Sequence, residues 1–309
     1  MSCIILELCT TGSDKADCKF SHFPPIPQTE NTGQNDAWLN YYKMKERGLG
    51  NRCRQGTFAV SVRVFRIGLL HHHSDFLQAM TLSEAIVARH SVRRYLDRPI
   101  DPAAIETLQA KIKDINAAGN LHAQLILDEP RAFRGIFAYG KFSGVTDYIV
   151  MTGPKDDTLD ERIGYYGQEL VLLAQTSGLN TCWVGLSYRK VGGTFTLAPG
   201  EKIGCYIALG YGQTQGTPHK TKTVGELGGV DADSPDWYRR GVEAARLAPS
   251  AINQQKFRFR CLGTDAEGRG LVGCSKGFSL VGYTAMDLGI AKRNFEIAAS
   301  PVKIIFSTL

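Results

Sequence analysis

Five consecutive residues, Arg89-His90-Ser91-Val92-Arg93, bring two guanidinium groups, an imidazole and a hydroxyl group together. A guanidinium binds phosphate through paired, charge-assisted hydrogen bonds, and a serine hydroxyl adds a neutral donor. A second basic segment, His219-Lys220-Thr221-Lys222, follows an apolar run that ends at Leu209-Gly210. Lys220 and Lys222 alternate along this segment, so in an extended backbone their side chains point the same way. Together the two segments predict a site for a phosphorylated ligand.

A third segment, Ala248-Pro249-Ser250-Ala251-Ile252-Asn253, follows a helical run that begins at Ser234-Pro235. Pro249 ends the helix, because a proline disfavours helical geometry in the residue before it. Serine and asparagine next to a proline favour a turn, and such a turn also forms without any ligand. The segment therefore predicts a polar turn and leaves ligand binding open.

In their order and spacing, these three segments resemble those of the nitroreductase family of flavin (FMN) oxidoreductases, in particular the branch that fuses two half-units in one chain. The resemblance extends from about Met80 to Ser300. It implies an α+β, nitroreductase-like fold in which tandem half-units form a pseudo-dimer. Because the phosphate motif and the Pro-Ser-Ala-x-Asn motif each occur once, it also implies one FMN per chain.

The resemblance implies how the first motif would hold FMN. Arg89 and Ser91 would contact the phosphate and the ribityl chain. Arg93 would lie at the N1 and O2 edge of the flavin, where a cation stabilises the reduced form and raises the reduction potential. Two alternatives stay open: a surface ion pair between Arg89 and a nearby carboxylate, and a solvated Arg93 beside an inward-pointing Arg94.

The turn at 248–253 would carry the pyrimidine edge of the flavin. The Asn253 amide offers a donor and an acceptor, as the alternating O2, N3-H and O4 groups require, and the backbone of Ser250 and Ala251 would serve likewise. Gly185 would let the backbone approach the ring closely. The complete predicted cofactor-binding set is Arg89, His90, Ser91, Arg93, Gly185, Lys220, Lys222, Pro249, Ser250, Ala251 and Asn253.

One part of the motif departs from the family's pattern. Where the family often has Gln-Pro-Trp after the asparagine, this chain has Gln255-Lys256-Phe257. The missing proline frees the turn and the missing indole reduces stacking area, so the pocket shape is expected to differ. Lys256 could instead reach a phosphate of a substrate or cofactor. Trp183, in a strand-like run, is expected to be a core residue.

Flavin N5 accepts and returns a hydride by itself, so this chemistry needs no protein nucleophile. The resemblance implies a nitroreductase-type oxidoreductase that passes hydride from NAD(P)H through FMN to a nitroaromatic, quinone or enone acceptor. No catalytic residue is identified, since the sequence does not distinguish among three conceivable proton donors, Tyr139, Tyr165 and Tyr166. The alternative is a non-catalytic protein that stores or senses FMN, with the open face of the ring covered.

Composition excludes several other classes. The 309 residues carry a formal charge of +6, and the basic residues are dispersed, which favours a small anionic ligand over nucleic acid. No apolar stretch reaches the roughly 18 residues of a membrane span, and the N-terminus lacks signal-peptide features, so no membrane partner and a cytoplasmic location are expected. The eight cysteines lack Cys-x-x-Cys spacing and predict free thiols and no metal site. A dimer fused in one chain is compatible with a monomer.

The chain changes character near Met80. Thr81 and Glu84 form a capping box, typical of the start of a helix. We interpret residues 1–79 as a poorly ordered or mistranslated extension, 80–230 as the first nitroreductase-like half and 231–309 as the second. Apolar periodicity and turn residues predict helices that begin near 81, 101, 159, 234 and 283, and strands at 125–127, 148–151, 182–184, 205–209 and 257–261.

A faint internal echo supports a duplication. Ile163-Gly164-Tyr165 with Glu169-Leu170 recurs as Val281-Gly282-Tyr283 with Asp287-Leu288, at the same separation along the chain. The echo fits an arrangement in which each half contributes a long central helix to a shared core.

Overall fold

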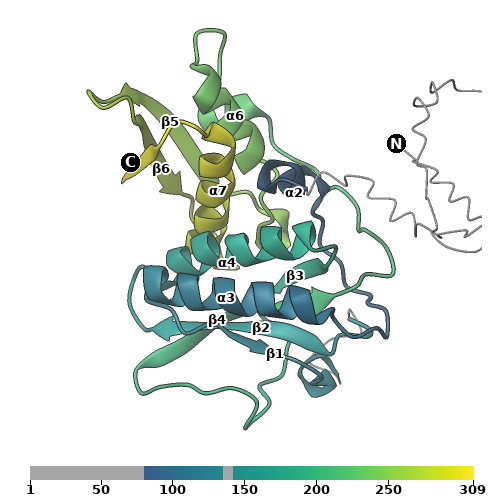
Figure 1. Ribbon diagram of the computed structural model, residues 1–309. Helices are drawn as coiled ribbons and strands as arrows, with labels where there is room; N and C mark the ends of the chain where they lie inside the picture. The colour runs from purple at the N-terminus through teal and green to yellow at the C-terminus, as the bar shows by residue number, and fades with distance from the viewer. Residues whose placement is uncertain (1–79, 135–141) are drawn as a thin grey trace, which may run out of the picture. The chain divides into compact units, whose positions relative to one another are not determined.

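The computed structural model describes residues 80–134 and 142–309 (Figure 1). Within these residues the helices are α2 (Leu82–Ala88), α3 (Pro102–Gly119), α4 (Leu159–Thr176), α5 (Val224–Gly228), α6 (Asp236–Ala245) and α7 (Thr284–Ala299), with 3-10 turns at Pro130–Phe133 and Ala251–Asn253. The strands are β1 (Gln124–Ile126), β2 (Asp147–Pro154), β3 (Asn180–Val184), β4 (Glu201–Gly210), β5 (Phe257–Thr264), β6 (Gly270–Lys276) and β7 (Ile304–Thr308). The predicted extension, residues 1–79, lies outside the described residues.

Local capping groups start and end the helices as the sequence predicts. The Thr81 hydroxyl accepts a hydrogen bond from the Glu84 amide at 3.2 Å, and the Glu84 carboxylate accepts one from the Thr81 amide at 2.7 Å. The Asp101 side chain accepts one from the Ala103 amide at the start of α3. After α4, Gly178 adopts a left-handed φ of 75°, which ends the helix. The capping box is thus confirmed.

The first sheet is four-stranded and antiparallel, in the order β1-β2-β4-β3. Side chains alternate between the two faces of a strand, and here both faces are covered. One face packs under α3 and α4, which lie over the sheet in Figure 1. This face receives Ile149, Met151, Cys205, Ile207 and Leu209, and the other receives Tyr148, Val150, Tyr206 and Ala208. Burial on both faces explains why these strands read as continuous apolar runs.

The second sheet has the order β5-β6-β7. Phe257 and Phe259 of β5 are buried and Arg258 and Arg260 are exposed, as the strict alternation predicts. Strand β6 pairs with β5 in antiparallel and with β7 in parallel. The sequence did not predict β6, β7 or α5, because β6 contains two glycines and no regular alternation.

The central helices α4 and α7 cross at two glycines. A Cβ atom on Gly164 would lie 2.0 Å from the carbonyl oxygen of Met286, and one on Gly289 would lie 2.1 Å from that of Glu161. Each glycine is the sixth residue of its helix, so the matching positions are Gly164 and Gly289. The internal echo paired Gly164 with Gly282, which lies before α7 begins, so it does not align the two glycines of this crossing.

The predicted α+β class is confirmed. The four-stranded sheet comes from residues before 231 and the three-stranded sheet from residues after it, although the division into tandem half-units stays a prediction. Among the described helices, none is both long enough and apolar enough to cross a membrane.

Candidate functional site

A cavity of about 320 Å³ opens between three segments that are distant in sequence. Its walls come from the end of β3 and the loop after it (182–187), from the turn between α6 and β5 (249–252), and from the start of α7 with the residues before it (281–290). Six residues of the predicted cofactor-binding set line it: Ser91, Arg93, Gly185, Pro249, Ser250 and Ala251. The structure therefore brings the first motif and the proline turn together at one cleft.

The backbone after α2 positions the first motif along β3. The Val92 amide donates to the Thr181 carbonyl oxygen at 3.0 Å, and Ser91 forms a parallel bridge with Thr181. This pairing places Ser91 and Arg93 beside the cavity wall that Cys182 begins. Arg94 is exposed and is not part of the lining. Arg93 is exposed as well, but it is among the lining residues, so an inward-pointing Arg94 is not observed, whereas the exposure of Arg93 agrees with the alternative.

Arg89 is buried without a partner. Its side chain is 2% exposed, and within the described part of the chain its Nε and Nη1 atoms have no hydrogen-bond partner. Burial lowers the pKa of the guanidinium to about 10, although the neighbouring Cys182 thiol acts in the opposite direction. Buried guanidinium groups are normally paired, so this one requires a hydrogen-bond acceptor that the described residues do not supply. The predicted surface ion pair is not formed within them.

Five residues of the predicted set do not line the cavity: Arg89, His90, Lys220, Lys222 and Asn253. Asn253 is exposed, and its amide donates to the Lys220 carbonyl oxygen at 2.9 Å and accepts from Gln255 at 2.9 Å. The Lys222 ammonium donates to the Gln255 carbonyl oxygen at 3.0 Å. His90 packs against the backbone of Gly216. The side chains of Asn253 and Lys222 are therefore used within the protein, and the sequence could not show this because their partners lie far along the chain.

Buried Gln255 joins the basic segment to the turn. Its amide nitrogen donates to the Lys220 carbonyl oxygen at 2.8 Å, and its amide oxygen accepts from the Lys222 amide at 2.8 Å. Lys256 next to it donates to the Phe278 carbonyl oxygen at 2.7 Å, so its ammonium is held by the protein rather than aimed into the cavity. The basic segment is thus fixed against the proline turn by an amide side chain that the motif comparison did not single out.

Exposed apolar side chains surround the mouth of the cavity. Each wall contributes one: Leu186 is 74% exposed, Ile252 is 78% exposed and Val281 is 40% exposed. Ile252 adopts a left-handed φ of 47°, which is strained for a β-branched residue. The apolar side chain of Ile252 is thus exposed at the cavity although its backbone adopts an unfavourable conformation.

Tyr283 and Asp287 of the cavity lining were not predicted as site residues. The Tyr283 hydroxyl donates to the Gly185 carbonyl oxygen at 2.9 Å, and its ring covers Gly185. Asp287 is 3% exposed. The candidate proton donors Tyr165 and Tyr166 do not line the cavity, and Tyr139 lies outside the described residues. No sequence motif singled out Tyr283 or Asp287 as a site residue; both occur in the internal echo, which was interpreted as a duplication and not as a site.

Three apolar predictions near the cavity can be compared with the structure. Cys182 and Cys205 are free and buried in β3 and β4, whereas the free Cys261 of β5 is only partly buried. Trp183 packs against Gly167 of α4, consistent with a core role. Cys182, Cys205 and Trp183 also line the cavity, so its inner surface is largely core.

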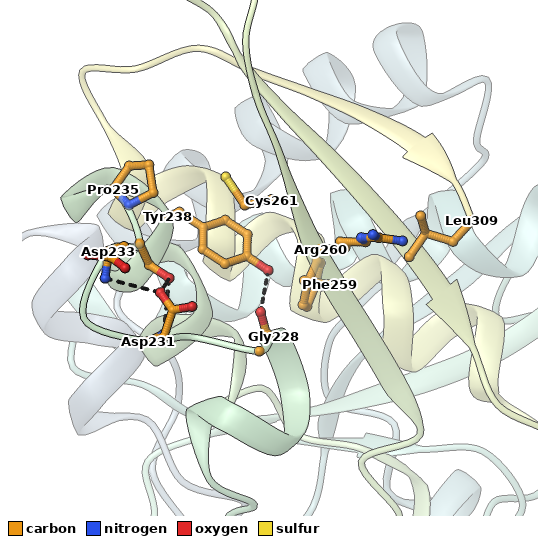
Figure 2. Close-up of a pocket in the computed structure, with 11 residues that line it drawn as sticks. Gly228, Asp231, Asp233, Pro235, Tyr238, Phe259, Arg260, Cys261 and Leu309 are labelled. Carbon is orange, nitrogen blue, oxygen red and sulfur yellow. Dashed lines mark hydrogen bonds between the residues drawn. The ribbon is translucent and has the colours of Figure 1, made fainter.

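A second cavity, of about 650 Å³, lies between the 228–235 loop, β5 and the last residue, and contains none of the predicted residues (Figure 2). Its polar groups satisfy one another. The Tyr238 hydroxyl donates to the Gly228 carbonyl oxygen at 2.8 Å, and the Asp231 carboxylate accepts from the Ser234 hydroxyl at 2.8 Å (Figure 2). None of its lining residues has a buried side-chain nitrogen or oxygen atom without a partner, whereas Arg89, which is close in sequence to the lining of the first cavity but not part of it, has two.

Comparison with known proteins identifies the family. The model of a family described as "Putative TM nitroreductase" matches residues 81–299. A putative nitroreductase from Thermotoga maritima has a similar fold, with a TM-score of 0.53 and 23% identity over 74% of this chain and 87% of that chain. A putative nitroreductase from Desulfovibrio desulfuricans, solved in complex with FMN, gives a TM-score of 0.38 and 20% identity over 50% of this chain and 96% of that chain. A search of curated proteins found no match. Because the family model covers most of the described residues, the chain belongs to the nitroreductase family.

Proposed function

We propose that the protein is an FMN-dependent oxidoreductase that passes hydride from NAD(P)H to a nitroaromatic, quinone or enone acceptor. When bound, FMN supplies the hydride chemistry, because its N5 atom accepts and returns the hydride. The protein's part is to bind, orient and shield the reactants. The observations that carry the proposal are the cavity that the two family motifs line and the buried, unpaired guanidinium of Arg89, which is two residues before Ser91 and close to Cys182 of that lining.

Polar groups in the cavity lining and close to it in sequence fit a flavin mononucleotide. Arg89 offers two unpaired donors, which suit a phosphate dianion, and Ser91 adds a hydroxyl in the cavity lining. Backbone groups of the 249–251 turn form the opposite wall, where they would meet the polar edge of the ring. In this proposal Asn253, Lys220 and Lys222 support the turn, and His90 supports the phosphate segment, rather than touching the ring.

The mouth of the cavity fits an apolar acceptor. Leu186, Ile252 and Val281 would cover the body of a flat aromatic molecule and exclude water from the reacting atoms. Tyr283 lines the cavity, and its hydroxyl donates a hydrogen bond to the Gly185 carbonyl oxygen. This arrangement supports turnover over storage, because the apolar entrance is lined by exposed residues.

Steady-state oxidation of NADH and NADPH with menadione or a nitrofuran tests the proposal. We expect acceptor-dependent oxidation by the yellow, full-length protein. A yellow protein that neither nicotinamide can bleach would instead favour the FMN-storage alternative. Monomeric state and cytoplasmic location stay predictions that this assay does not address.

Arg93→Ala should leave flavin bound but lower its reduction potential. Arg93 is an exposed residue of the cavity lining, and in the proposed binding mode its removal takes away a cation near N1 and O2, which disfavours the anionic reduced flavin. We expect a decrease of about 30 mV or more, which for two electrons corresponds to about 1.4 kcal/mol. Equilibration with redox dyes measures the potential. Arg94→Ala, at the exposed neighbour outside the cavity, is the matched control, and equal potentials in the two variants would contradict the assignment.

A further inference from the structure

The buried carboxylate of Asp287 lies at the junction of two cavity walls. It belongs to the first turn of α7, is 3% exposed and lines the cavity. One oxygen, Oδ1, accepts a hydrogen bond from the backbone amide of Ala251 at 3.0 Å. The other, Oδ2, accepts one from the side-chain amide of Gln254 at 2.7 Å. Both donors belong to the turn between α6 and β5. The carboxylate thus ties this turn to α7.

Gln254 extends this connection to the third segment. The same amide nitrogen that donates to Asp287 also donates to the Gly282 carbonyl oxygen at 3.0 Å. Gly282 lies between Val281 and Tyr283, which line the cavity. One carboxylate and one amide side chain therefore hold together the two walls that carry Ile252 and Val281.

The turn that Asp287 holds is strained. Ile252, Asn253 and Gln255 have positive φ angles of 47°, 57° and 46°. Side chains with a Cβ atom adopt this region at a cost, so the turn persists only where its surroundings fix it. The Ala251 amide bond to Asp287 lies directly before the first strained residue. The carboxylate is therefore placed to select this backbone conformation.

Keeping this carboxylate ionised costs stability. Burial raises the pKa of Asp287 from 3.8 to about 6, against the opposite effect of the bonds from Gln254 and Ala251, and no charged side chain contributes to the shift. Arg93, Cys182, Cys205 and Tyr283 are the other titratable groups of the cavity lining, and Asp160 and Glu161 lie on the first turn of α4, the helix packed against α7. Because the pKa is raised in the folded state, the ionised form destabilises the fold above about pH 6. A group retained at such a cost is expected to serve a function.

We propose that Asp287 is a positioning residue of the cofactor cavity, which fixes the 249–254 turn and the 281–283 segment through Ala251 and Gln254. It presets the wall that the flavin ring and the acceptor meet. This inference rests on the proposed function only in taking FMN as the ligand. Asp287 acts through the turn and is not itself assigned to the chemistry.

The test compares FMN affinity with stability in the full-length protein after removal of its flavin. In Asp287→Asn the new amide retains one acceptor oxygen but presents its NH2 group to the Gln254 side-chain amide, which is also a donor. The hydrogen bond between the turn and residue 287 through Gln254 is therefore lost. We expect FMN affinity, measured by quenching of flavin fluorescence, to fall about tenfold at pH 7.5. The thermal midpoint of the flavin-free variant should rise by about 3 °C or more at pH 7.5, and the gain should shrink near pH 5, where the native carboxyl is mostly protonated.

Two further variants keep the proposal falsifiable. Gln254→Ala should weaken FMN binding similarly. The double variant Asp287→Asn/Gln254→Ala should bind FMN only slightly more weakly than the weaker-binding single variant, because both substitutions remove the same hydrogen bond. Asp236→Asn, in the exposed first turn of α6, is the matched control and should change neither property. A drop in stability and affinity together in Asp287→Asn would reduce the residue to a structural role. Unchanged affinity would overturn the proposal, whereas a wild-type protein that does not bind FMN would refute the proposed function instead.

Discussion

Arg89→Ala should yield a largely colourless protein that still folds. The Arg89 guanidinium is buried, and its Nε and Nη1 atoms lack partners within residues 80–134 and 142–309. If a phosphate is the missing partner, the variant loses a desolvated, charge-assisted pair, for which losses of about 2–5 kcal/mol are typical. This corresponds to an FMN affinity lower by roughly 30-fold to several thousandfold. Flavin absorbance per polypeptide, followed by titration with FMN, measures the loss.

Removal of the Arg89 charge should stabilise the flavin-free protein, in contrast to its effect on FMN affinity. The pKa of Arg89 falls from 12.5 to about 10 on burial, so the unfolded chain binds the proton more tightly than the folded chain. At pH 7 the charged side chain then costs the fold on the order of 3 kcal/mol. Arg89→Met removes that charge and keeps much of the side-chain volume, so its flavin-free form should unfold at a higher urea concentration than the wild type.

Two substitutions separate charge from geometry at this position. Arg89→Lys retains a cation but loses the planar pair of donors, and should recover only part of the affinity. Arg94→Ala removes an exposed guanidinium from the same segment and should retain full flavin content. A full complement of flavin in Arg89→Ala would show that the phosphate is held elsewhere.

The sequence predicted the site where short motifs carry their own chemistry. Ser91, Arg93 and the 249–251 turn were identified by residue type and order, and the structure brings them to one cavity. The starts of the longer helices were predicted equally well, because capping is local: the groups of Thr81 and Glu84 are three residues apart, although the same capping box at Thr223 and Glu226 of the short α5 was missed. Local interactions and local motifs can be recognised without knowledge of the fold.

Interactions between distant segments could not be predicted in this way. Asn253 was expected to face a ligand, but its amide pairs with Lys220 and Gln255 because the basic segment packs on the turn. Asp287 reads as an ordinary acidic residue in the first turn of a helix, and only the packing of the 249–254 turn on α7 turns it into a buried carboxylate. In both cases the partner, not the residue, determines the role.

The crossing of α4 and α7 is another contact between segments that are distant in sequence and could not be predicted. A substitution at this crossing is expected to have the largest effect on folding. Gly164→Ala should destabilise the protein by about 3 kcal/mol or more. The added Cβ atom would meet the Met286 carbonyl oxygen at 2.0 Å and the Ile290 amide nitrogen at 3.0 Å, both of them backbone atoms that cannot rotate away. The two helices would have to separate, although alanine is by itself the better helix former.

Separating these helices should also impair the cavity, because Met286, Asp287 and Ile290 of α7 line it. We therefore expect Gly164→Ala to lower the urea midpoint and the flavin content together, and Gly289→Ala, whose Cβ would lie 2.1 Å from the Glu161 carbonyl oxygen, to do the same. Gly225→Ala in the exposed part of α5 is the control, since the nearest atom to its Cβ is 4.0 Å away and helix propensity alone should make it neutral or slightly stabilising. If Gly164→Ala and Gly225→Ala unfolded at the same urea concentration, the close contact between the central helices would not exist in solution.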